Sequence, residues 1–477
     1  MKTLTSCIAG RWLEPRAAQP LADVINPATE EVVARIALGD ASDVDAAVKA
    51  ARSAFARYGQ AALDERIALL ESLLSIFERR YDEMVTAIST EMGAPHDLSK
   101  DSQAACGPGH LKAVIEAARS LEWESRSGTN AKLVLEPIGV CALITPWNWP
   151  VNQLAAKVSP ALAAGCTMVL KPSELAPLSA QLFAEFIEEA GYAPGVFNMV
   201  HGTGPVVGRA LASHPQIDMV SFTGSTRAGI DVAKSAADTV KRVAQELGGK
   251  NANIVFADTD LEAAVKRGVL HCFNNSGQSC NAPTRMLVEA SVYERATEIA
   301  AAVGSKVRVG DPMQPGRHIG PVVSRQQYEK IQRLIEKGIA EGARPIVGGP
   351  GKPPGFEKGY YVKPTIFRDV NNQMTIAREE IFGPVLAMIP FKDIDEAIDI
   401  ANDSPYGLGA FVQSGDIEKA RSVARRLRTG MVCLNGASQD YGSPFGGYKQ
   451  SGNGREWGAY GLHEFLEVKS INGFYAA

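Results

Sequence analysis

The chain has 477 residues, enough for about three domains of average size, and its cores can be stable without disulfides or a structural metal. Its 49 basic and 53 acidic side chains leave a net charge of −4, which excludes the concentrated basic surface that nucleic acid or an anionic membrane requires. Hydrophobic residues make up 45% and charged residues 21%, as in globular proteins and unlike disordered, collagenous or coiled-coil ones.

The seven cysteines are scattered along the chain, and no two form a C-x-x-C pair. An odd number with this spacing is atypical of a disulfide framework or a zinc site and favours a reducing compartment. The N-terminus lacks the apolar core of a signal peptide, and the longest apolar stretch, near residues 161–170, is too short to cross a membrane. We therefore predict a cytoplasmic protein without a metal site, in which at most one cysteine has a special role.

The N-terminal third is predicted to be helical. Ser42, with Asp45 three residues later, is a plausible N-cap for a helix whose apolar residues 44–55 follow helical spacing. A second apolar run with the same spacing extends over residues 67–88 and stops at Gly93.

From residue 132 the pattern changes to short apolar strands, first at 132–137 and 140–144. Strand, loop and helix then follow one another three times, which predicts a parallel sheet with crossover helices. Ligands of such sheets bind at the carboxyl ends of the strands, so the three loops are candidate binding segments. The three strands are predicted at 167–170, 196–200 and 219–222, and their helices at 179–190, 206–211 and 232–237.

A second α/β region begins near residue 251. Its strands are predicted at 254–256, 286–288, 384–390 and 431–435, and its helices at 292–303 and 326–339. Residues 465–471 alternate like a strand, and such a terminal strand must pair within the chain or on a neighbouring subunit.

Two of the three loops contain glycines at the start of a helix. Gly204 and Gly208 lie in the first, and Gly224 and Ser225 lie in the second. Glycines let backbone N–H groups approach a pyrophosphate at a helix N-terminus, although neither loop has the G-x-G-x-x-G pattern and plain turns are the alternative.

The third loop places Lys171 and Glu174 just beyond a strand end. A carboxylate there suits the hydroxyls of an adenosine ribose and would repel a 2′-phosphate. A surface ion pair is the alternative, but the two glycine loops at neighbouring strand ends favour a nucleotide site.

Cys280 follows the segment Phe-Asn-Asn-Ser-Gly-Gln-Ser, residues 273–279. These small and polar residues are poor core material and predict an exposed loop, the setting that a nucleophilic thiolate requires. A buried structural cysteine is the alternative. His271 could act as its base, but a structural role is the simpler interpretation of this histidine.

Glu246 is followed by Leu247 and two glycines, which let the backbone crowd around its carboxylate. Such a group could activate water as a general base, since burial would raise its pKa toward neutrality. A helix-end glutamate with a glycine C-cap is the alternative.

Asn148 lies at the centre of Pro-Trp-Asn-Trp-Pro, residues 146–150, after an apolar strand. An amide fixed between prolines and tryptophans is a good oxyanion donor because it stabilises developing charge without titrating. A buried turn held by asparagine hydrogen bonds is the alternative.

Together these motifs resemble the NAD(P)-dependent aldehyde dehydrogenase superfamily over nearly the whole chain. Further matches are residues 25–29, Glu-Glu-Ile-Phe-Gly-Pro at 379–384 and Pro-Phe-Gly-Gly-Tyr-Lys at 444–449. The resemblance implies an α/β fold with a Rossmann-like nucleotide-binding domain, an α/β catalytic domain and a small β arm that makes a homodimer or homotetramer. These parts would be residues 1–120 and 138–248, residues 249–462, and residues 121–137 with 463–477.

The resemblance also implies roles for particular residues. Cys280 would be the nucleophile, Glu246 the general base, Asn148 an oxyanion-hole donor together with the Cys280 N–H, and Glu456 a secondary acid or base. The cofactor would be NAD, with NADP as the alternative, and the substrate a small aldehyde. The cofactor would lie against Ile144, Pro146, Trp147, Lys171, Ser173, Glu174, Gly204, Gly208, Phe222, Gly224, Ser225, Leu247, Glu380 and Phe382.

The chain departs from the family pattern at several positions. Arg227 stands where many members have glutamate, and Ala156 where many have a large aromatic residue. With the polar Asp440 and Tyr441 nearby, this predicts a roomy and partly polar substrate pocket. Its residues would be Trp149, Gln153, Ala156, Gln439 and Phe445.

Three other functions compete with hydrolytic aldehyde oxidation. They are acyl transfer to coenzyme A, a thiol hydrolase without a nicotinamide cofactor, and a binding protein with an inactive site. Glu246 argues against the first because acylating relatives usually lack this carboxylate, and the nucleotide loops argue against the second. The intact set of Cys280, Glu246 and Asn148 argues against the third.

Overall fold

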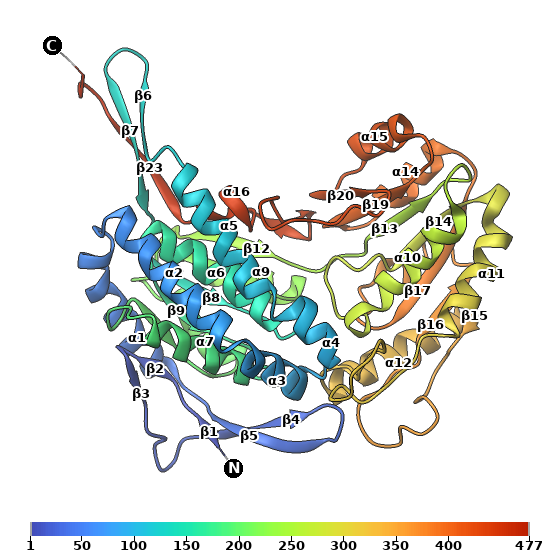
Figure 1. Ribbon diagram of the computed structural model, residues 1–477, viewed down its shortest axis with the longest axis horizontal. Helices are drawn as coiled ribbons and strands as arrows, with labels where there is room; N and C mark the ends of the chain where they lie inside the picture. The colour runs from blue at the N-terminus through green and yellow to red at the C-terminus, as the bar shows by residue number, and fades with distance from the viewer. Residues whose placement is uncertain (1, 476–477) are drawn as a thin grey trace.

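The computed structural model describes residues 2–475 and shows two lobes, with a narrow arm projecting from one of them (Figure 1). The chain begins with strands, so the prediction of a helical N-terminal third is wrong for its first 37 residues. These strands are short and pair with distant segments, which periodicity within one segment does not reveal. They are β1 (Thr3–Leu4), β2 (Cys7–Ile8), β3 (Arg11–Trp12), β4 (Leu21–Asn26) and β5 (Glu31–Ala37).

The first helix, α1 (Ala41–Tyr58), is capped by Asp40 and not by Ser42. Asp40 accepts hydrogen bonds from the backbone N–H groups of Ser42 and Asp43, and the Asp43 side chain accepts one from Asp40. This reciprocal pair is a capping box two residues earlier than the predicted cap, which is therefore wrong.

The predicted helix at residues 67–88 is divided at Arg80 into α2 (Leu63–Arg79) and α3 (Tyr81–Met92). It ends as predicted at Gly93, whose φ of +75° is the left-handed conformation that glycine adopts without strain.

The first large sheet has the order β22-β12-β11-β8-β9-β10-β2-β3. Its five central strands are parallel, as predicted, so their carboxyl ends lie at one edge. Strand β8 lies between β9 and β11, and the chain proceeds to opposite sides from it, which makes this edge a topological switch point where ligands bind. The strands are β8 (Val140–Ile144), β9 (Thr167–Lys171), β10 (Phe197–Met199), β11 (Met219–Thr223), β12 (Arg242–Glu246) and β22 (Gly452–Asn453).

Helices cover both faces of this sheet. Alternate residues of β8, such as Leu143 and Ala142, pack into two different cores, as expected for a strand buried on both faces. One core holds α2, α5 (Cys106–Ser120), α6 (Pro150–Ala164) and α7 (Pro177–Glu189), and the other holds α1, α8 (Arg209–Ser213) and α9 (Thr226–Ala236).

The second large sheet has the order β15-β16-β17-β14-β13-β19-β20, and all but β15 are parallel. Helices α10 and α11 pack on one face, and α12, α14 and α15 pack on the other. The strands are β13 (Ala252–Val255), β14 (Arg285–Glu289), β15 (Arg344–Val347), β16 (Thr365–Arg368), β17 (Val385–Phe391), β19 (Gly409–Gln413) and β20 (Met431–Leu434), and the helices are α10 (Leu261–Phe273), α11 (Tyr293–Gly304), α12 (Arg325–Ala340), α13 (Thr375–Arg378), α14 (Ile394–Asn402) and α15 (Ile417–Arg426).

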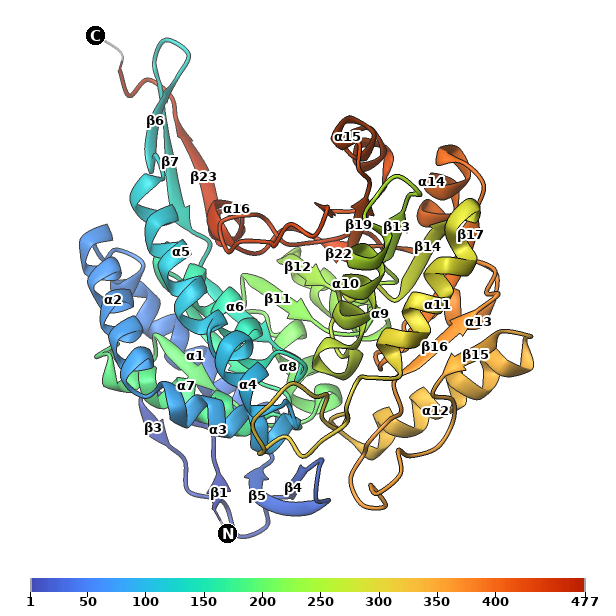
Figure 2. The same ribbon diagram turned by 45° about the vertical axis from the view of Figure 1, so that its right-hand side comes forward.

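The arm is an antiparallel sheet of β6 (Glu124–Ser127), β7 (Ala131–Pro137) and β23 (Leu466–Ile471). Figure 2 shows it extending away from both lobes. The terminal strand therefore pairs within the chain, with Leu466 opposite Pro137 and Ile471 opposite Lys132. Residues 476 and 477 of the predicted arm lie outside the described residues. No helix between residues 2 and 475 is both long and apolar enough to cross a membrane.

A buried carboxylate joins α3 to α7. Glu91 is inaccessible to solvent and accepts hydrogen bonds from the backbone N–H groups of Leu178 and Ser179 and from the Ser179 hydroxyl. Helix α7 has no N-cap side chain of its own, so Glu91 supplies that cap. Burial raises the pKa of Glu91 to about 7, and the hydrogen bonds oppose this shift.

Glu91→Gln is expected to lower the free energy of unfolding by about 1–3 kcal/mol, because the new amide group faces an N–H donor. Since folding raises the pKa of the wild-type carboxyl, the wild type loses stability as pH rises from about 4.5 through 7, whereas the glutamine contributes no such loss. The thermal midpoints of the two proteins should therefore converge between about pH 5 and pH 8. A difference that widens with pH would contradict this assignment.

Candidate active site

Three loops meet at the carboxyl edge of the first sheet. Strand β9 ends at Lys171, whose buried Nζ lies 2.9 Å from the Glu174 carboxylate, itself partly exposed. The ion pair given as an alternative is thus present, but at the sheet edge and not on an isolated surface. The neighbouring β10 leads to buried His201, whose pKa is lowered to about 4 by burial and by the charge of Lys171. Sequence reasoning missed His201 because nothing in its surroundings sets it apart.

The two glycine loops differ in their surroundings. A Cβ atom on Gly204 or Gly208 would meet no atom within 4 Å, so this helix start faces open space. At the other loop the Ser225 hydroxyl caps α9 by accepting a hydrogen bond from the Ala228 N–H, and Phe222 packs beneath Gly224. Both loops can therefore approach an anionic group closely.

The segment after Glu246 is held by Glu380 of the 379–384 motif and by Ser451, two residues beyond the 444–449 motif. The Leu247 N–H donates to the Ser451 carbonyl at 2.9 Å, and the Gly249 N–H donates to Glu380 at 2.9 Å. Burial raises the pKa of Glu380, against the opposing charges of two nearby lysines. The rings of Phe382 and Trp147 meet edge-on, with their centroids 5.5 Å apart. Trp147 follows the end of β8, where Ile144 and Thr145 are buried and Pro146 is half-buried.

The segment before Cys280 is buried, so the prediction of an exposed loop is wrong for residues 275–278, and Cys280 itself is half-buried. Asn275, Ser276 and Gly277 all adopt positive φ, between 53° and 75°, which coils the backbone tightly. Asn, Ser and Gly suit this turn because short polar or absent side chains tolerate the left-handed region. A Cβ atom on Gly277 would overlap the carbonyl group of Gly383.

Asn148 docks directly on this turn. Its Nδ2 donates to the Gln278 carbonyl at 3.1 Å, and the Asn148 carbonyl accepts from Asn275 at 2.9 Å. Trp149 adds a hydrogen bond from its indole to the Ser279 hydroxyl at 2.8 Å. Asn148, the predicted oxyanion donor, thus lies beside the turn that leads to Cys280, and the second hydrogen of its amide remains available.

Asn251, which sequence reasoning missed, also holds the loop around Cys280. Its Nδ2 donates to the Cys280 carbonyl at 2.7 Å and to the Ala282 carbonyl at 3.0 Å, while its Oδ1 accepts from the Gly409 N–H. It lies just beyond the glycines that follow Glu246, in the loop that joins the two large sheets.

Glu246 is the last residue of strand β12, so the alternative of a capped helix end is wrong. Both carboxylate oxygens are buried and have no hydrogen-bond partner among the described residues. Gly446 lies close above the carboxylate, where a Cβ atom would be 2.7 Å from Oε1. Burial, followed by the charge of Glu456, raises the pKa of Glu246 well above its usual range, and Lys157 and Arg455 oppose the shift.

Glu456 pairs with a lysine that sequence reasoning missed. The Lys157 ammonium is buried, contacts the Glu456 carboxylate and donates to the Ser221 hydroxyl at 3.0 Å. Lys157 is the one charged residue in helix α6, and a charge in an otherwise apolar helix was a signal that could have revealed it.

The electrostatic environment of Cys280 favours the neutral thiol. Burial raises the pKa of Cys280, and the charges of Glu246, Glu380 and Glu456 raise it further, whereas the Asn281 N–H lowers it. Both the Cys280 thiol and the Glu246 carboxyl therefore gain charge only as pH rises, and each opposes ionisation of the other. His271 is exposed and packs on Phe411, which does not support its role as a base.

The predicted pocket residues occupy different surroundings. Gln153 and Ala156 are buried on α6, and the Gln153 Oε1 atom has no partner among the described residues. The Gln439 amide instead contacts the sulfur of Met431 at 3.0 Å. Phe445 pairs through its backbone with Glu456.

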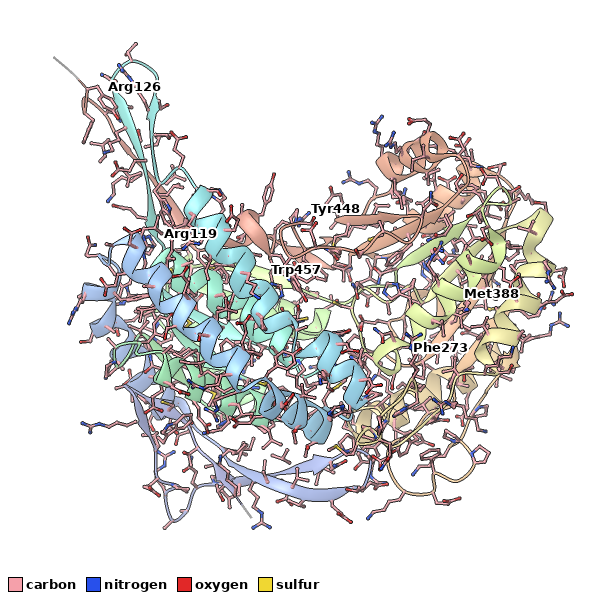
Figure 3. The ribbon with its side chains drawn as sticks, in the orientation of Figure 1. Arg119, Arg126, Phe273, Met388, Tyr448 and Trp457 are labelled. Carbon is pink, nitrogen blue, oxygen red and sulfur yellow. The ribbon has the colours of Figure 1, made fainter. Side chains whose placement is uncertain are left out.

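An aromatic cluster that sequence reasoning missed adjoins Phe445. The ring centroid of Trp457 lies 4.6 Å from that of Phe445 and 5.1 Å from that of His110. The centroids of His110 and Tyr441 are 4.7 Å apart. Figure 3 shows Trp457 just before α16 (Gly458–His463), where the C-terminal chain has returned to the first lobe. Gly109 permits this cluster, since a Cβ atom there would overlap the Tyr441 ring.

Gly277→Ala is expected to lower kcat by about 100-fold, because the added methyl group must displace the turn that positions Cys280. Gly191→Ala is the matched control: its φ of +89° resembles the +75° of Gly277, but a Cβ atom there meets nothing within 4 Å. The control should lose about 1 kcal/mol of stability and keep its kcat. Equal losses of kcat in the two variants would show that backbone strain, and not the contact with Gly383, is responsible.

The fold and this geometry define an α/β protein with a Rossmann-like sheet, a half-buried cysteine thiol and a buried carboxylate at the last residue of strand β12. The aldehyde dehydrogenase family profile matches residues 12–471, and the chain belongs to that family. The predicted family and fold class are thus confirmed.

Among its relatives is a 3-succinoylsemialdehyde-pyridine dehydrogenase from Pseudomonas sp., 56% identical over 98% of each chain. An aldehyde dehydrogenase from Bartonella henselae has 51% identity and a TM-score of 0.97, over 99% of this chain and 100% of that one. Aldehyde dehydrogenase C from Pseudomonas syringae has 49% identity and a TM-score of 0.98, over 99% of this chain and 97% of that one. Its structure is that of a cysteine-to-alanine mutant in complex with NAD+ and octanal.

Proposed function

We propose that this protein oxidises an aldehyde to the carboxylic acid with NAD+, through a covalent intermediate on Cys280. The observation that carries the proposal is that Asn148 is hydrogen-bonded to the loop that ends at Cys280, while the glycine segment that follows Glu246 packs against the Cys280 backbone. A nucleophile, an amide donor and a buried base in one place are the parts that acyl transfer to water requires.

The residues at the sheet edge fit a dinucleotide. Open space above Gly204 and Gly208 leaves room for a ligand, and Glu174 would accept hydrogen bonds from the adenosine ribose. Glu380 and Phe382 would hold the nicotinamide end. When bound, NAD+ would accept the hydride that leaves the aldehyde carbon. The other cofactor contacts would come from Ile144, Pro146, Trp147, Lys171, Ser173, Phe222, Gly224, Ser225 and Leu247.

The chain itself supplies the covalent chemistry. The Cys280 thiolate attacks the aldehyde carbon, and the Asn148 amide with the Cys280 N–H stabilises the resulting oxyanion. Loss of hydride leaves a thioester on Cys280. Glu246 then removes a proton from water, whose oxygen attacks the thioester and releases the acid and the thiolate. Glu456, held by Lys157, is a secondary acid or base for that proton.

Acyl transfer to coenzyme A is the second candidate for the second half-reaction. A buried carboxylate without hydrogen-bond partners, such as Glu246, favours hydrolysis because it can accept a proton from water. Product analysis with coenzyme A present separates the two: free acid is expected, and acyl-coenzyme A would replace hydrolysis as the assigned reaction.

For the substrate we propose a bulky or polar aldehyde. The small Ala156, the polar Gln153 and the aromatic cluster around Trp457 suit such a group better than a plain alkyl chain. The name of the Pseudomonas relative, which joins a pyridine to a semialdehyde, supports this class, whereas the octanal complex of the other relative supports the alternative. Steady-state rates across an aldehyde panel test it, and a higher kcat/KM for octanal than for aryl or keto aldehydes would overturn it.

We further propose that the first sheet with its helices, residues 1–120 and 138–248, binds the cofactor and that residues 249–462 form the catalytic domain. The arm, residues 121–137 and 463–477, would contact a second copy in a cytoplasmic homodimer or homotetramer. The 65% exposed Val468 supports this, since it lies on an edge strand of the arm whose free backbone groups can pair with another strand.

The choice between NAD and NADP is proposed to depend on Glu174. Glu174→Gln removes a negative charge that would repel a 2′-phosphate, so the ratio of kcat/KM for NADP to that for NAD should rise about 3–10-fold. The effect is modest because the side chain is 38% exposed and solvent screens its charge. Glu122→Gln, an exposed position near the arm, is the control. An unchanged ratio in the Glu174 variant would remove this residue from cofactor selection.

A further inference from the structure

One buried side chain, that of Asn251, holds the backbone on both sides of residue 281. Its Nδ2 group donates to the Cys280 carbonyl at 2.7 Å and to the Ala282 carbonyl at 3.0 Å. Its Oδ1 atom accepts a hydrogen bond from the Gly409 N–H at 2.8 Å. These bonds use both amide hydrogens, and they fix which end of the amide faces Cys280.

The backbone around Asn251 holds this side chain in place. Asn251 lies in the loop between β12 and β13, which crosses from one lobe to the other (Figure 1). Its side chain is buried, and its carbonyl accepts a hydrogen bond from the Arg285 N–H at 3.1 Å. A Cβ atom on Gly249 in the same loop would lie 2.5 Å from the Cys280 carbonyl oxygen. The glycine therefore lets the Cys280 carbonyl come close enough to the loop for Asn251 to hold it.

The carbonyl of Cys280 belongs to the same peptide unit as the Asn281 N–H. This peptide is trans, so its N–H points in the opposite direction to its C=O. Because the unit is also planar, a side chain that fixes the direction of the carbonyl fixes the direction of the N–H as well. Asn251 thus determines where the Asn281 N–H points.

The direction of this N–H affects the Cys280 thiol. Burial raises the pKa of Cys280, and so do the charges of three carboxylates, whereas the Asn281 N–H lowers it. The carboxylates come from three elements: Glu246 ends β12, Glu380 follows α13 and Glu456 precedes α16. A donor near the sulfur favours the thiolate over the neutral thiol.

We propose that Asn251 is a positioning residue, which holds the Cys280 carbonyl and thereby directs the Asn281 N–H toward the Cys280 sulfur. The N–H then stabilises the thiolate that attacks the aldehyde, and Asn251 acts through this peptide. The proposal rests on the function proposed above, in which Cys280 is the nucleophile. The orientation of the peptide does not depend on that function, so a chemical probe of the thiol tests it separately.

Alkylation of Cys280 by iodoacetamide in the cofactor-free protein, followed by mass spectrometry of the Cys280 peptide, is that probe. In Asn251→Ala the carbonyl is released, and the N–H is no longer directed at the sulfur. Loss of this interaction should raise the thiol pKa by about 0.5–1, so alkylation below that pKa should be about 3–10-fold slower than in the wild type. Asn251→Ser keeps one hydroxyl donor near the two carbonyls and should give an intermediate rate.

Asn198→Ala is the matched control. Asn198 is also buried, its Nδ2 group donates to the carbonyls of Met168 and Gly195, and its Oδ1 atom accepts from the Ala9 N–H. The variant removes hydrogen bonds of the same number and kind from strand β10 of the first sheet. Its thermal midpoint should fall as in the Asn251 variant, whereas the alkylation rate of Cys280 should match the wild type.

Aldehyde kinetics provide the second readout. Asn251→Ala should slow the NADH burst about 3–10-fold at neutral pH, because less thiolate is present, and the aldehyde KM and NAD+ dissociation constant should change less than about twofold. Faster alkylation would show that Asn251 only packs the loop over the thiol, and an unchanged rate would show that the N–H does not depend on it. Either result would overturn the proposal, whereas full activity of Cys280→Ser would overturn the proposed function instead.

Discussion

Cys280→Ser is expected to lower kcat by at least about 10⁴-fold while the NAD+ dissociation constant changes less than about twofold. A serine hydroxyl has nearly the shape of the thiol but ionises far less readily, and His271, the histidine considered as its base, is exposed and packs on Phe411. The loops proposed to bind the cofactor lie at the edge of the first sheet, so their geometry should not change. Single-turnover NADH release and equilibrium binding of NAD+ measure the two quantities.

Cys433→Ser is the matched control, because this half-buried cysteine lies on β20 and has no assigned role. It should retain the wild-type kcat. Comparable losses in both variants, or full activity of Cys280→Ser, would remove Cys280 as the nucleophile.

The raised pKa of Cys280 gives this prediction a pH dependence. Because burial and nearby carboxylates favour the neutral thiol, its thiolate fraction increases through the alkaline range. Alkylation of Cys280 by iodoacetamide in the absence of cofactor should therefore accelerate with pH well above neutrality. A rate that is already constant at neutral pH would show that the thiol pKa is not raised.

Glu246→Gln is expected to release about one NADH per active site in a burst and then to lower the steady-state rate by about 10²–10⁴-fold. Attack, hydride loss and thioester formation do not need this carboxylate, whereas deprotonation of water does. Glutamine fits the same space, and its amide cannot accept the proton. Stopped-flow NADH absorbance measures the burst and the following phase separately.

Glu380→Gln is the contrasting variant, since Glu380 is assigned to the cofactor. It should weaken NAD+ binding and slow the burst without separating the two phases. Loss of the burst in Glu246→Gln would place Glu246 in the first half-reaction. Because burial raises the pKa of Glu246, the wild-type kcat should also increase with pH when deacylation limits the rate.

The parallel sheet and its ligand-binding edge could be predicted because each strand–loop–helix unit is a local pattern. Strands β8, β9, β10 and β11 lie within about two residues of their predicted bounds. Gly93 likewise ends its helix as predicted, since a glycine C-cap depends on one backbone conformation. The strand pairing of the first 37 residues depends on distant partners, and here the prediction failed.

Candidate site residues could be predicted where the local sequence around them is unusual. They could not be predicted where only tertiary packing brings them to the site. Cys280, Glu246 and Asn148 lie in or beside unusual local sequences, and the structure places Asn148 on the loop that leads to Cys280. The contact between Lys157 and Glu456 joins residues almost 300 positions apart, so no local pattern contains it. The N-cap of α1 could not be predicted to the residue, because Asp40 and Ser42 each begin a possible capping pattern. In the structure Asp40 is the residue that caps the helix.

The most direct test of a covalent intermediate on Cys280 is mass spectrometry of Glu246→Gln after mixing with a good aldehyde substrate and NAD+. We expect the Cys280 peptide to gain the mass of the aldehyde less two hydrogens, which is the thioester formed after hydride loss. The Cys280→Ser, Glu246→Gln double variant should show no such adduct. An unmodified Cys280 peptide during NADH release, or an adduct on another residue, would contradict the proposed chemistry.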